Sequence, residues 1–214
     1  SARPTQFFLD QVRTTKEKAE RLIRVDLPKK ICSLNEYLES VQNEFLKNSD
    51  VSKVDVTTDV VECNKEIMKL NASLKQEMID FLAIYDVLQM WITYNRAPYD
   101  NGHPIGEEVQ NELFSYLENG KDSAVDMFDA LKSYHQARAD NIRNSRKNMQ
   151  VADLVECVRA LDTSHYITLC QGFRDLRNAY SMILDKIEKN YEKLTNPKGV
   201  AAHMQHELLY RSEE

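Results

Sequence analysis

The chain has 214 residues, of which only five are glycine and five are proline, and its formal net charge is −6. Collagen-like chains, Gly/Pro-rich disordered tracts and many-turned β-sandwiches all depend on these two residue types, so their scarcity excludes those classes and favours long helices. The negative charge argues against a general nucleic-acid binder, which needs a basic surface to displace counterions.

The four cysteines, Cys32, Cys63, Cys157 and Cys170, form no CxxC pair and are too sparse for a disulfide framework. We expect reduced thiols in an intracellular protein, most of them small core residues. No apolar run reaches the roughly 18 residues of a membrane span. The segment 1–4 does not resemble the start of a secretory signal.

Apolar residues recur at steps of three and four over residues 27–45, which predicts a helix with one apolar face. An earlier apolar stretch, 8–23, continues this helix on the other side of Pro28. Proline removes a backbone donor and clashes with the preceding turn, so we expect a kink near Leu27. The pattern stops over residues 47–59, which indicates a polar linker.

Three further apolar patterns cover residues 60–92, 109–142 and 158–194 and predict three more helices. Pro197 cannot continue the last helix, and Gly199 can accept a left-handed cap. These four helices predict an all-α fold, an elongated antiparallel four-helix bundle. Residues 1–199 are then a single domain, and residues 200–214 form a flexible tail.

Aromatic residues flank the apolar patterns, and association of subunits through helix faces would bury them. We therefore expect an oligomer. The residues concerned are Tyr94, Tyr116, Tyr134 and Tyr166.

A helical bundle can hold a di-iron site built from Glu-x-x-His motifs, and the nearest approach in this chain is Asp162-x-x-His165. We interpret His165 as a hydrogen-bonded core or interface residue, because the remaining ligands are absent. The sequence lacks the common nucleophile, phosphate and dinucleotide motifs, and Cys63 and Cys157 have no neighbouring histidine as a base. We expect no catalytic residues, no metal and no cofactor.

Four basic residues lie near the end of the third predicted helix: Arg138, Arg143, Arg146 and Lys147. They could form an anion-binding patch. Cations near a helix C-terminus are favoured by the backbone dipole in any case, so a solvated helix end is the favoured interpretation.

Four of the ten glycines and prolines lie within residues 97–106, between the second and third helices. Asn-Gly permits positive φ while proline fixes φ, so this loop is expected to follow a defined path. A plain interhelical turn is the alternative. In an antiparallel bundle this loop lies at the same end as the last residue of the fourth helix. We therefore expect the loop and the tail after Gly199 to share one face and one partner.

Several segments, taken in their order and spacing, are specific to one family. They are Leu27-Pro28-Lys29-Lys30-Ile31, Met90-Trp91, Asn101-Gly102-His103-Pro104-Ile105-Gly106 with Val109-Gln110, Leu176-Arg177-Asn178-Ala179-Tyr180, and Ile187-Glu188-Lys189-Asn190-Tyr191-Glu192-Lys193-Leu194 with Pro197. In these segments the chain resembles the 11S regulator (REG) family of proteasome activators, closest to its gamma-type members.

The resemblance implies a four-helix subunit in a heptameric ring with a central channel, which stacks on the 20S proteasome without using ATP. Tails of the family enter pockets between proteasome α subunits, and the loop between helices two and three displaces gate residues. The activation loop is then Asp100, Asn101, Gly102, His103, Pro104, Ile105 and Gly106, and the docking tail is Leu208, Leu209 and Tyr210. Changing Ile105 or Gly106 should reduce stimulation more than binding, whereas deleting residues 208–214 should abolish binding.

The chain departs from the family pattern at three places. His103-Pro104 stands where the loop typically carries two consecutive asparagines, and residues 211–214 follow Tyr210, where family tails tend to finish. The acidic extension should weaken docking if the terminal carboxylate must lie near Tyr210. The short linker lacks the basic nuclear-targeting run of some members, so nucleus and cytoplasm both stay open. The alternative function is a non-catalytic oligomeric helical scaffold that does not open the proteasome gate.

Overall fold

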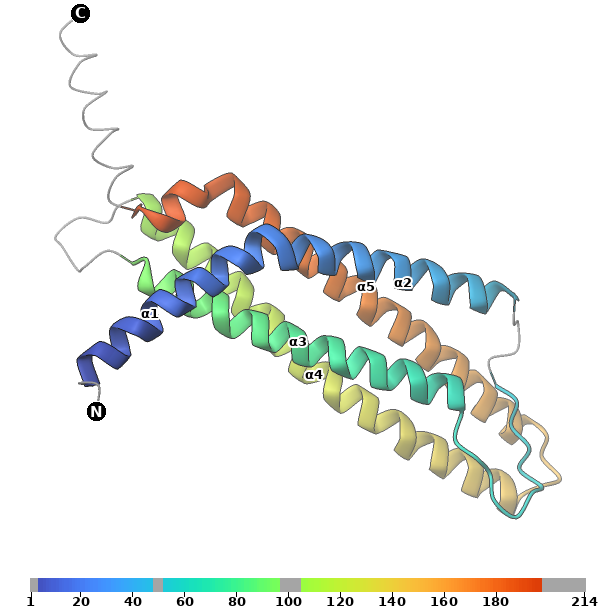
Figure 1. Ribbon diagram of the computed structural model, residues 1–214. Coiled ribbons are helices and arrows are strands. Elements are labelled where there is room, and N and C mark those ends of the chain that lie inside the picture. The colour runs from blue at the N-terminus through green and yellow to red at the C-terminus, as the bar shows by residue number, and fades with distance from the viewer. Residues whose placement is uncertain (1–3, 48–51, 97–104, 198–214) are drawn as a thin grey trace, which may run out of the picture. The chain divides into compact units, whose positions relative to one another are not determined.

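The computed structural model of the chain describes residues 4–47, 52–96 and 105–197 (Figure 1). Over these ranges the regular elements are all helical: α1 (Pro4–Arg21), η1 (Leu22–Asp26), α2 (Leu27–Lys47), α3 (Lys65–Tyr94), α4 (Ile105–Lys147) and α5 (Asp153–Thr195). The first predicted helix comprises α1, η1 and α2, and the other three correspond to α3, α4 and α5. The predicted all-α class with four helices is therefore confirmed. No helix in the described ranges is long and apolar enough to span a membrane.

The chain divides into two compact units. Within the described ranges, the first unit joins residues 4–31, 82–96, 105–121 and 179–197, and the second joins residues 32–47, 52–81 and 122–178. Each unit has its own apolar core. The largest fully buried side chains of the first unit are Trp91, Tyr180, Leu27, Leu88, Ile92 and Leu113, and those of the second are Phe81, Phe173, Leu34, Ile67, Leu74 and Met78.

A wide helical turn, η1, separates α1 from α2 in the first unit. The backbone N–H of Leu27 donates to the carbonyl oxygen of Leu22, five residues back rather than four, which makes the turn π-helical. Pro28 explains this turn, because proline has no N–H for the Arg24 carbonyl and its ring would clash with that carbonyl in an α-helix. The break predicted near Leu27 is thus present as a π-helical turn.

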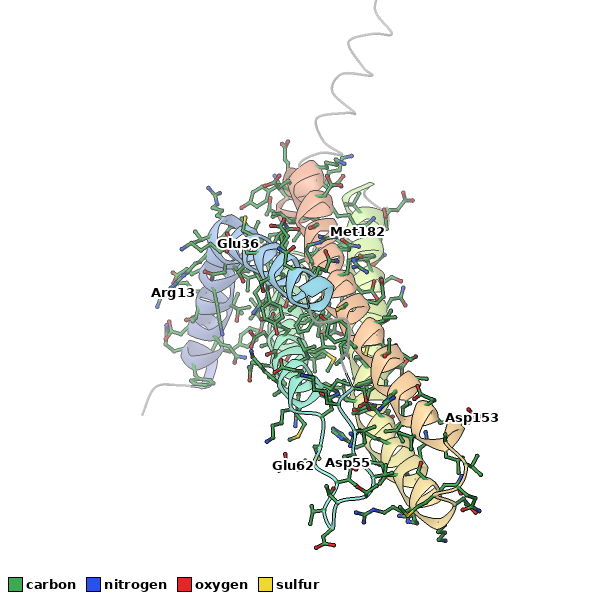
Figure 2. The ribbon with its side chains drawn as sticks, turned by 90° about the vertical axis from the view of Figure 1, so that its right-hand side faces the viewer. Arg13, Glu36, Asp55, Glu62, Asp153 and Met182 are labelled. Carbon is green, nitrogen blue, oxygen red and sulfur yellow. The ribbon has the colours of Figure 1, made fainter. Side chains whose placement is uncertain are left out.

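The connection from Ser52 to Asn64 in the second unit is held by apolar packing. Val54 and Val56 are buried against Val158, while Asp55 between them is exposed. Figure 2 shows Asp55 and Glu62 on this connection. The guanidinium of Arg146 donates to the carbonyl oxygens of Val56, Thr58 and Asp59. Alternation of buried and exposed residues, together with these bonds, gives the connection a defined path.

Helix α3 begins at Lys65, later than the apolar pattern predicts. Asn64 caps it, because its Oδ1 accepts a hydrogen bond from the backbone N–H of Ile67 at 3.2 Å. Val60 and Cys63, which the pattern placed in the helix, lie in the connection and are exposed.

Two expectations about burial were wrong. Cys32, Cys63 and Cys157 are exposed, and only Cys170 of the four cysteines is buried. Tyr134 and Tyr166 are buried within the second unit, so they are not available for association between subunits. Tyr166 donates its phenolic hydrogen to the carbonyl oxygen of Val41 at 2.9 Å, which satisfies its polar end inside the fold.

Candidate functional site at the ends of α3 and α5

Gln110 joins the ends of two helices in the first unit. It lies one turn into α4, is only 1% exposed, and its Nε2 donates to the carbonyl oxygen of Leu194 at 2.8 Å. The same nitrogen donates to the carbonyl oxygen of Asn95 at 3.3 Å. Leu194 lies in the last turn of α5, and Asn95 directly follows α3. The start of α4 is therefore bonded to the ends of both neighbouring helices.

Gly106 brings the start of α4 against the residues that follow α5. A Cβ atom at this position would lie 2.6 Å from Cα of Pro197 and 2.9 Å from the carbonyl oxygen of Lys193. Both atoms belong to the backbone, so they cannot give way as the end of a flexible side chain would. Only glycine permits this close approach. The residue that ends the 97–106 loop thus contacts Pro197, the last described residue before the C-terminal segment.

The last turns of α5 change direction at Asn190, whose φ of −126° and ψ of 16° are not helical. Its Nδ2 donates to the carbonyl oxygen of Lys186 at 3.0 Å. Tyr191, the next residue, donates its phenolic hydrogen to the carboxylate of Glu20 on α1, and its ring lies 6.3 Å from that of Trp91 on α3. Burial, aided by Glu20, raises the pKa of Tyr191 and keeps the hydroxyl protonated. The end of α5 is therefore fastened to two other helices.

Arg96 fixes the chain just beyond α3. Its Nη2 donates to Oδ1 of Asn111 at 3.0 Å, and its guanidinium carbon lies 5.4 Å from the ring centroid of Phe114. Glu107 and Glu108 occupy the first turn of α4, where the helix dipole favours negative charge. The described residues on both sides of the 97–104 segment are consequently held in place by several independent contacts.

The predicted site residues fall partly within the described ranges. Ile105 and Gly106 form the first turn of α4 rather than a loop. Asp100, Asn101, Gly102, His103 and Pro104 lie outside the described residues, as do Leu208, Leu209 and Tyr210 and the rest of the tail. From the sequence, Gln110 was identified only as part of the family-specific segments, and Pro197 also as the residue that ends the last helix. Gln110 lies three residues before the buried Leu113 and seven before the buried Leu117 of α4, and this spacing is the signal that could have identified it as a buried polar residue.

A second polar centre lies in the second unit around Asp162, whose side chain is completely buried. Oδ1 accepts hydrogen bonds from Tyr134 Oη and Arg138 Nε, both at 2.9 Å. Oδ2 accepts from Ser52 Oγ at 2.7 Å and from Asn64 Nδ2 at 3.2 Å. Four donors, one of them cationic, compensate for the burial of the carboxylate. This centre attaches the connection between α2 and α3 to α4 and α5.

Arg138 is not part of a solvated helix end, as the basic pattern suggested. Its side chain is 8% exposed, pairs with Asp162, and donates from Nη1 to the carbonyl oxygen of Glu62 at 3.1 Å. Arg146 likewise donates to backbone carbonyls, whereas Arg143 is an exposed partner of Asp140. These contacts commit Arg138 and Arg146 to holding the fold rather than to binding an anion.

His165 is a hydrogen-bonded core residue, as interpreted from the sequence. Its Nε2 lies 3.0 Å from Oδ1 of Asn71, and its ring stacks on Tyr134 with centroids 3.9 Å apart and planes inclined by 4°. Burial, together with the charge of the nearby His135, lowers the pKa of His165 to about 4, although Asp162 acts in the opposite direction. Among the described residues, no group of three or more His, Cys, Asp or Glu side chains is arranged to hold a metal ion.

The depressed pKa of His165 predicts a loss of stability in mild acid. The unfolded chain binds the proton at the ordinary pKa of 6.5, so the free energy of unfolding is unaffected above that value and falls as the pH drops toward about 4. We expect this residue to account for about 1–3 kcal/mol of the fall. His165→Gln keeps a donor for Asn71 but does not titrate, so its urea-unfolding curves should depend less on pH between these values.

The exposed His135 provides the comparison for this measurement: His135→Gln removes only the smaller of the two causes that lower the pKa of His165, so it should keep most of the pH dependence of the unmodified chain. If the free energy of unfolding changed equally with pH in the unmodified chain and in His165→Gln, His165 would not be the source of the pH dependence.

Two family matches cover most of the chain. Residues 12–60 match the N-terminal part, and residues 60–204 the C-terminal part, of a family described as proteasome activator PA28.

Relatives and a solved structure agree with these matches. The chain is 23% identical to "Proteasome activator 28" of Dictyostelium discoideum over 87% of its own length and 88% of that protein. It is 25% identical to human "Proteasome activator complex subunit 3" over 71% of its length, which covers 58% of that subunit. The crystal structure of the 11S subunit of the Plasmodium falciparum proteasome, PA28, superimposes with a TM-score of 0.81 and 26% identity, over 90% of this chain and 93% of that one.

Proposed function

The chain belongs to the PA28 family of proteasome activators, and from this we propose that it activates the 20S proteasome without using ATP. Copies of the chain form a ring, a heptamer by resemblance, that stacks on the proteasome α-ring. The tail residues Leu208, Leu209 and Tyr210 enter pockets between α subunits. The loop from Asp100 to Gly106 displaces gate residues so that peptides can pass.

The observation that carries this proposal is the contact between Gly106 and Pro197. Gly106 ends the proposed activation loop, and Pro197 is the last described residue before the C-terminal segment that carries the proposed docking residues. Their close packing, supported by the bonds of Gln110, starts both segments from one small region of the first unit. A single partner can then engage both segments at once.

Presentation of several tails on one ring supplies affinity that a single short tail lacks. Once one tail is bound, the others dock as intramolecular events at a high effective concentration, so overall binding exceeds that of each tail. The loop contributes to gate opening only through a difference, because it must interact more favourably with the open gate than with the closed one. Tail and loop therefore have separable roles.

The protein acts as a regulator and not as an enzyme in this proposal. The homologous proteins are named as proteasome activators, and the chemistry of peptide hydrolysis belongs to the proteasome. The location we propose is the nucleus or the cytoplasm, where reduced cysteines such as the exposed Cys32 and Cys157 are stable.

Hydrolysis of a fluorogenic peptide by purified latent 20S proteasome from the same organism tests the proposal. We expect the full chain, at the mass of a ring, to stimulate hydrolysis in proportion to proteasome capping. A ring that neither caps the proteasome nor stimulates it over a wide concentration range would favour the alternative of a helical scaffold.

The separate roles of loop and tail predict two different defects. Ile105→Ala should lower maximal stimulation while leaving the concentration for half-maximal effect nearly unchanged. Deletion of residues 208–214 should abolish binding, whereas a chain that stops at Tyr210 should bind at least as well, because its terminal carboxylate then lies on Tyr210. Titration of each variant against a fixed amount of proteasome measures both quantities. Identical defects in the loop variant and in the longer deletion would contradict this division.

A further inference from the structure

Gln110 makes an uncommon connection between helix ends. The last four carbonyl oxygens of an α-helix have no partner within the helix and are normally satisfied by water, by caps or by nearby side chains. Here one buried amide nitrogen on α4 donates to the carbonyl of Leu194 in the last turn of α5 and to that of Asn95 directly after α3. One side chain thus serves the C-terminal ends of two different helices.

Two buried atoms at the same place lack hydrogen-bond partners in the described part of the chain. They are Oε1 of Gln110 and Nδ2 of Asn95. A buried amide group that is only half satisfied is a poor contributor to stability, because it loses hydration without full compensation. An apolar side chain of similar length would fill the same space without this cost, but it would leave the carbonyl oxygens of Asn95 and Leu194 without the donor that Gln110 supplies. The glutamine at this position is therefore accounted for by the two carbonyls that it joins.

Packing around Gln110 restricts how far the helix ends can move. Gly106, one turn earlier on α4, contacts Pro197, and Tyr191 fastens α5 to Glu20. Arg96 is held by Asn111, one residue beyond Gln110. With these contacts in place, the amide of Gln110 sets the separation between the carbonyls of Asn95 and Leu194.

We propose that Gln110 is the positioning residue that couples the end of α3 to the end of α5, and that both gate opening and docking depend on this coupling. The inference rests on the function proposed above. Gln110 acts through the two carbonyl groups it binds and touches no partner itself. Its loss should therefore change both properties of the activator, unlike a change confined to the loop or to the tail.

Gln110→Met provides the first test, because methionine matches glutamine in length and removes both donors. Loss of two ordinary hydrogen bonds corresponds to a change of about tenfold. We expect maximal stimulation to fall and the half-maximal concentration to rise, their combined change being about tenfold, while native mass and helix content stay unchanged. Gln136→Met, an exposed position on α4, should behave as the unmodified chain.

Gln110→Lys separates hydrogen bonding from packing. Lysine retains donors for the two carbonyls, and a cation is favoured beside helix C-termini. A positioning role predicts that Gln110→Lys retains most of the stimulation that Gln110→Met loses. A packing role predicts the opposite order, because methionine fits the space better. If Gln110→Met does not assemble into a ring, Gln110→Lys alone decides the question. Stimulation by Gln110→Lys close to that of the unmodified chain supports the inference, and a loss of stimulation overturns it.

The remaining outcomes are also decisive. Unchanged titration of Gln110→Met overturns the coupling, and so does a change confined to stimulation or to binding. If the unmodified chain itself does not stimulate the proteasome, the proposed function fails instead. Amide hydrogen exchange then tests the coupling: Gln110→Met should accelerate exchange in both 91–96 and 190–196, and acceleration in neither segment or in only one overturns it.

Discussion

Asp162→Ala is expected to lower the free energy of unfolding by about 3–5 kcal/mol, because it leaves the buried guanidinium of Arg138 without its countercharge. Tyr134 and Ser52 lose their acceptor at the same time. Removal of one member of a buried ion pair costs more than the pair itself contributes, since an uncompensated charge is expensive in a low-dielectric interior. Urea unfolding at a fixed protein concentration measures the change.

Asp140→Ala is the matched control, because it also removes the aspartate of an Asp–Arg ion pair. Asp140 pairs with Arg143 at 2.7 Å, but the two side chains are 57% and 65% exposed. An exposed pair contributes about 0–1 kcal/mol, so this variant should unfold almost as the unmodified chain does. Addition of Arg138→Met to Asp162→Ala should recover part of the loss by removing the stranded charge. If Asp162→Ala and Asp140→Ala lowered the free energy of unfolding by similar amounts, burial would not determine the cost of breaking an ion pair in this protein.

Gly106→Ala is expected to reduce maximal stimulation by about tenfold or more, the effect of losing about 1.4 kcal/mol of preference for the open gate. The added methyl group would lie 2.6 Å from Cα of Pro197, so α4 or the residues after α5 must shift. Because Pro197 leads into the C-terminal segment that carries the proposed docking residues, we also expect weaker binding. This extends the expectation from sequence, in which Gly106 affected stimulation more than binding.

Gly120→Ala makes the same change in the same helix, where Gly120 is only half-buried. There it should raise the free energy of unfolding by up to about 1 kcal/mol, because alanine is a better helix former, and it should leave stimulation unchanged. Both variants are titrated against the proteasome and unfolded in urea. The comparison separates the effect of the Gly106–Pro197 contact from the general effect of replacing a helical glycine by alanine. Wild-type stimulation by Gly106→Ala would refute the role of the Pro197 contact.

The helices were predictable because one physical rule governs them. Residues such as Leu74, Phe81 and Leu88 recur with the helical period, and they are the side chains that the fold buries. The same rule identified His165 as a core residue, since it lies on the apolar face of α5. The burial of the cysteines was mispredicted because Cys32 and Cys157 lie off the apolar faces and follow no such rule.

The polar contacts could not be predicted from spacing. Ser52 and Asp162 are 110 positions apart, and no local pattern relates them. Position on an apolar face marks Asp162 and Gln110 as buried polar residues, but it does not say which donors or acceptors they meet. The close contact of Gly106 with Pro197 depends likewise on how distant helix ends pack. The roles of the remaining loop and tail residues stay predictions.

The π-helical turn from Leu22 to Asp26 has a consequence for comparing chain lengths within the family. A π-helical turn contains one residue more than an α-helical turn, and each residue of an α-helix turns the chain by about 100°. If all of these residues were in an ordinary α-helix, the buried Ala19 would turn by about 100° away from its present face relative to Leu27. Deletion of the exposed Val25 would remove the extra residue and keep Ala19 on that face. A relative with an ordinary α-helix here should therefore be one residue shorter, and an alignment gap at this turn marks the difference.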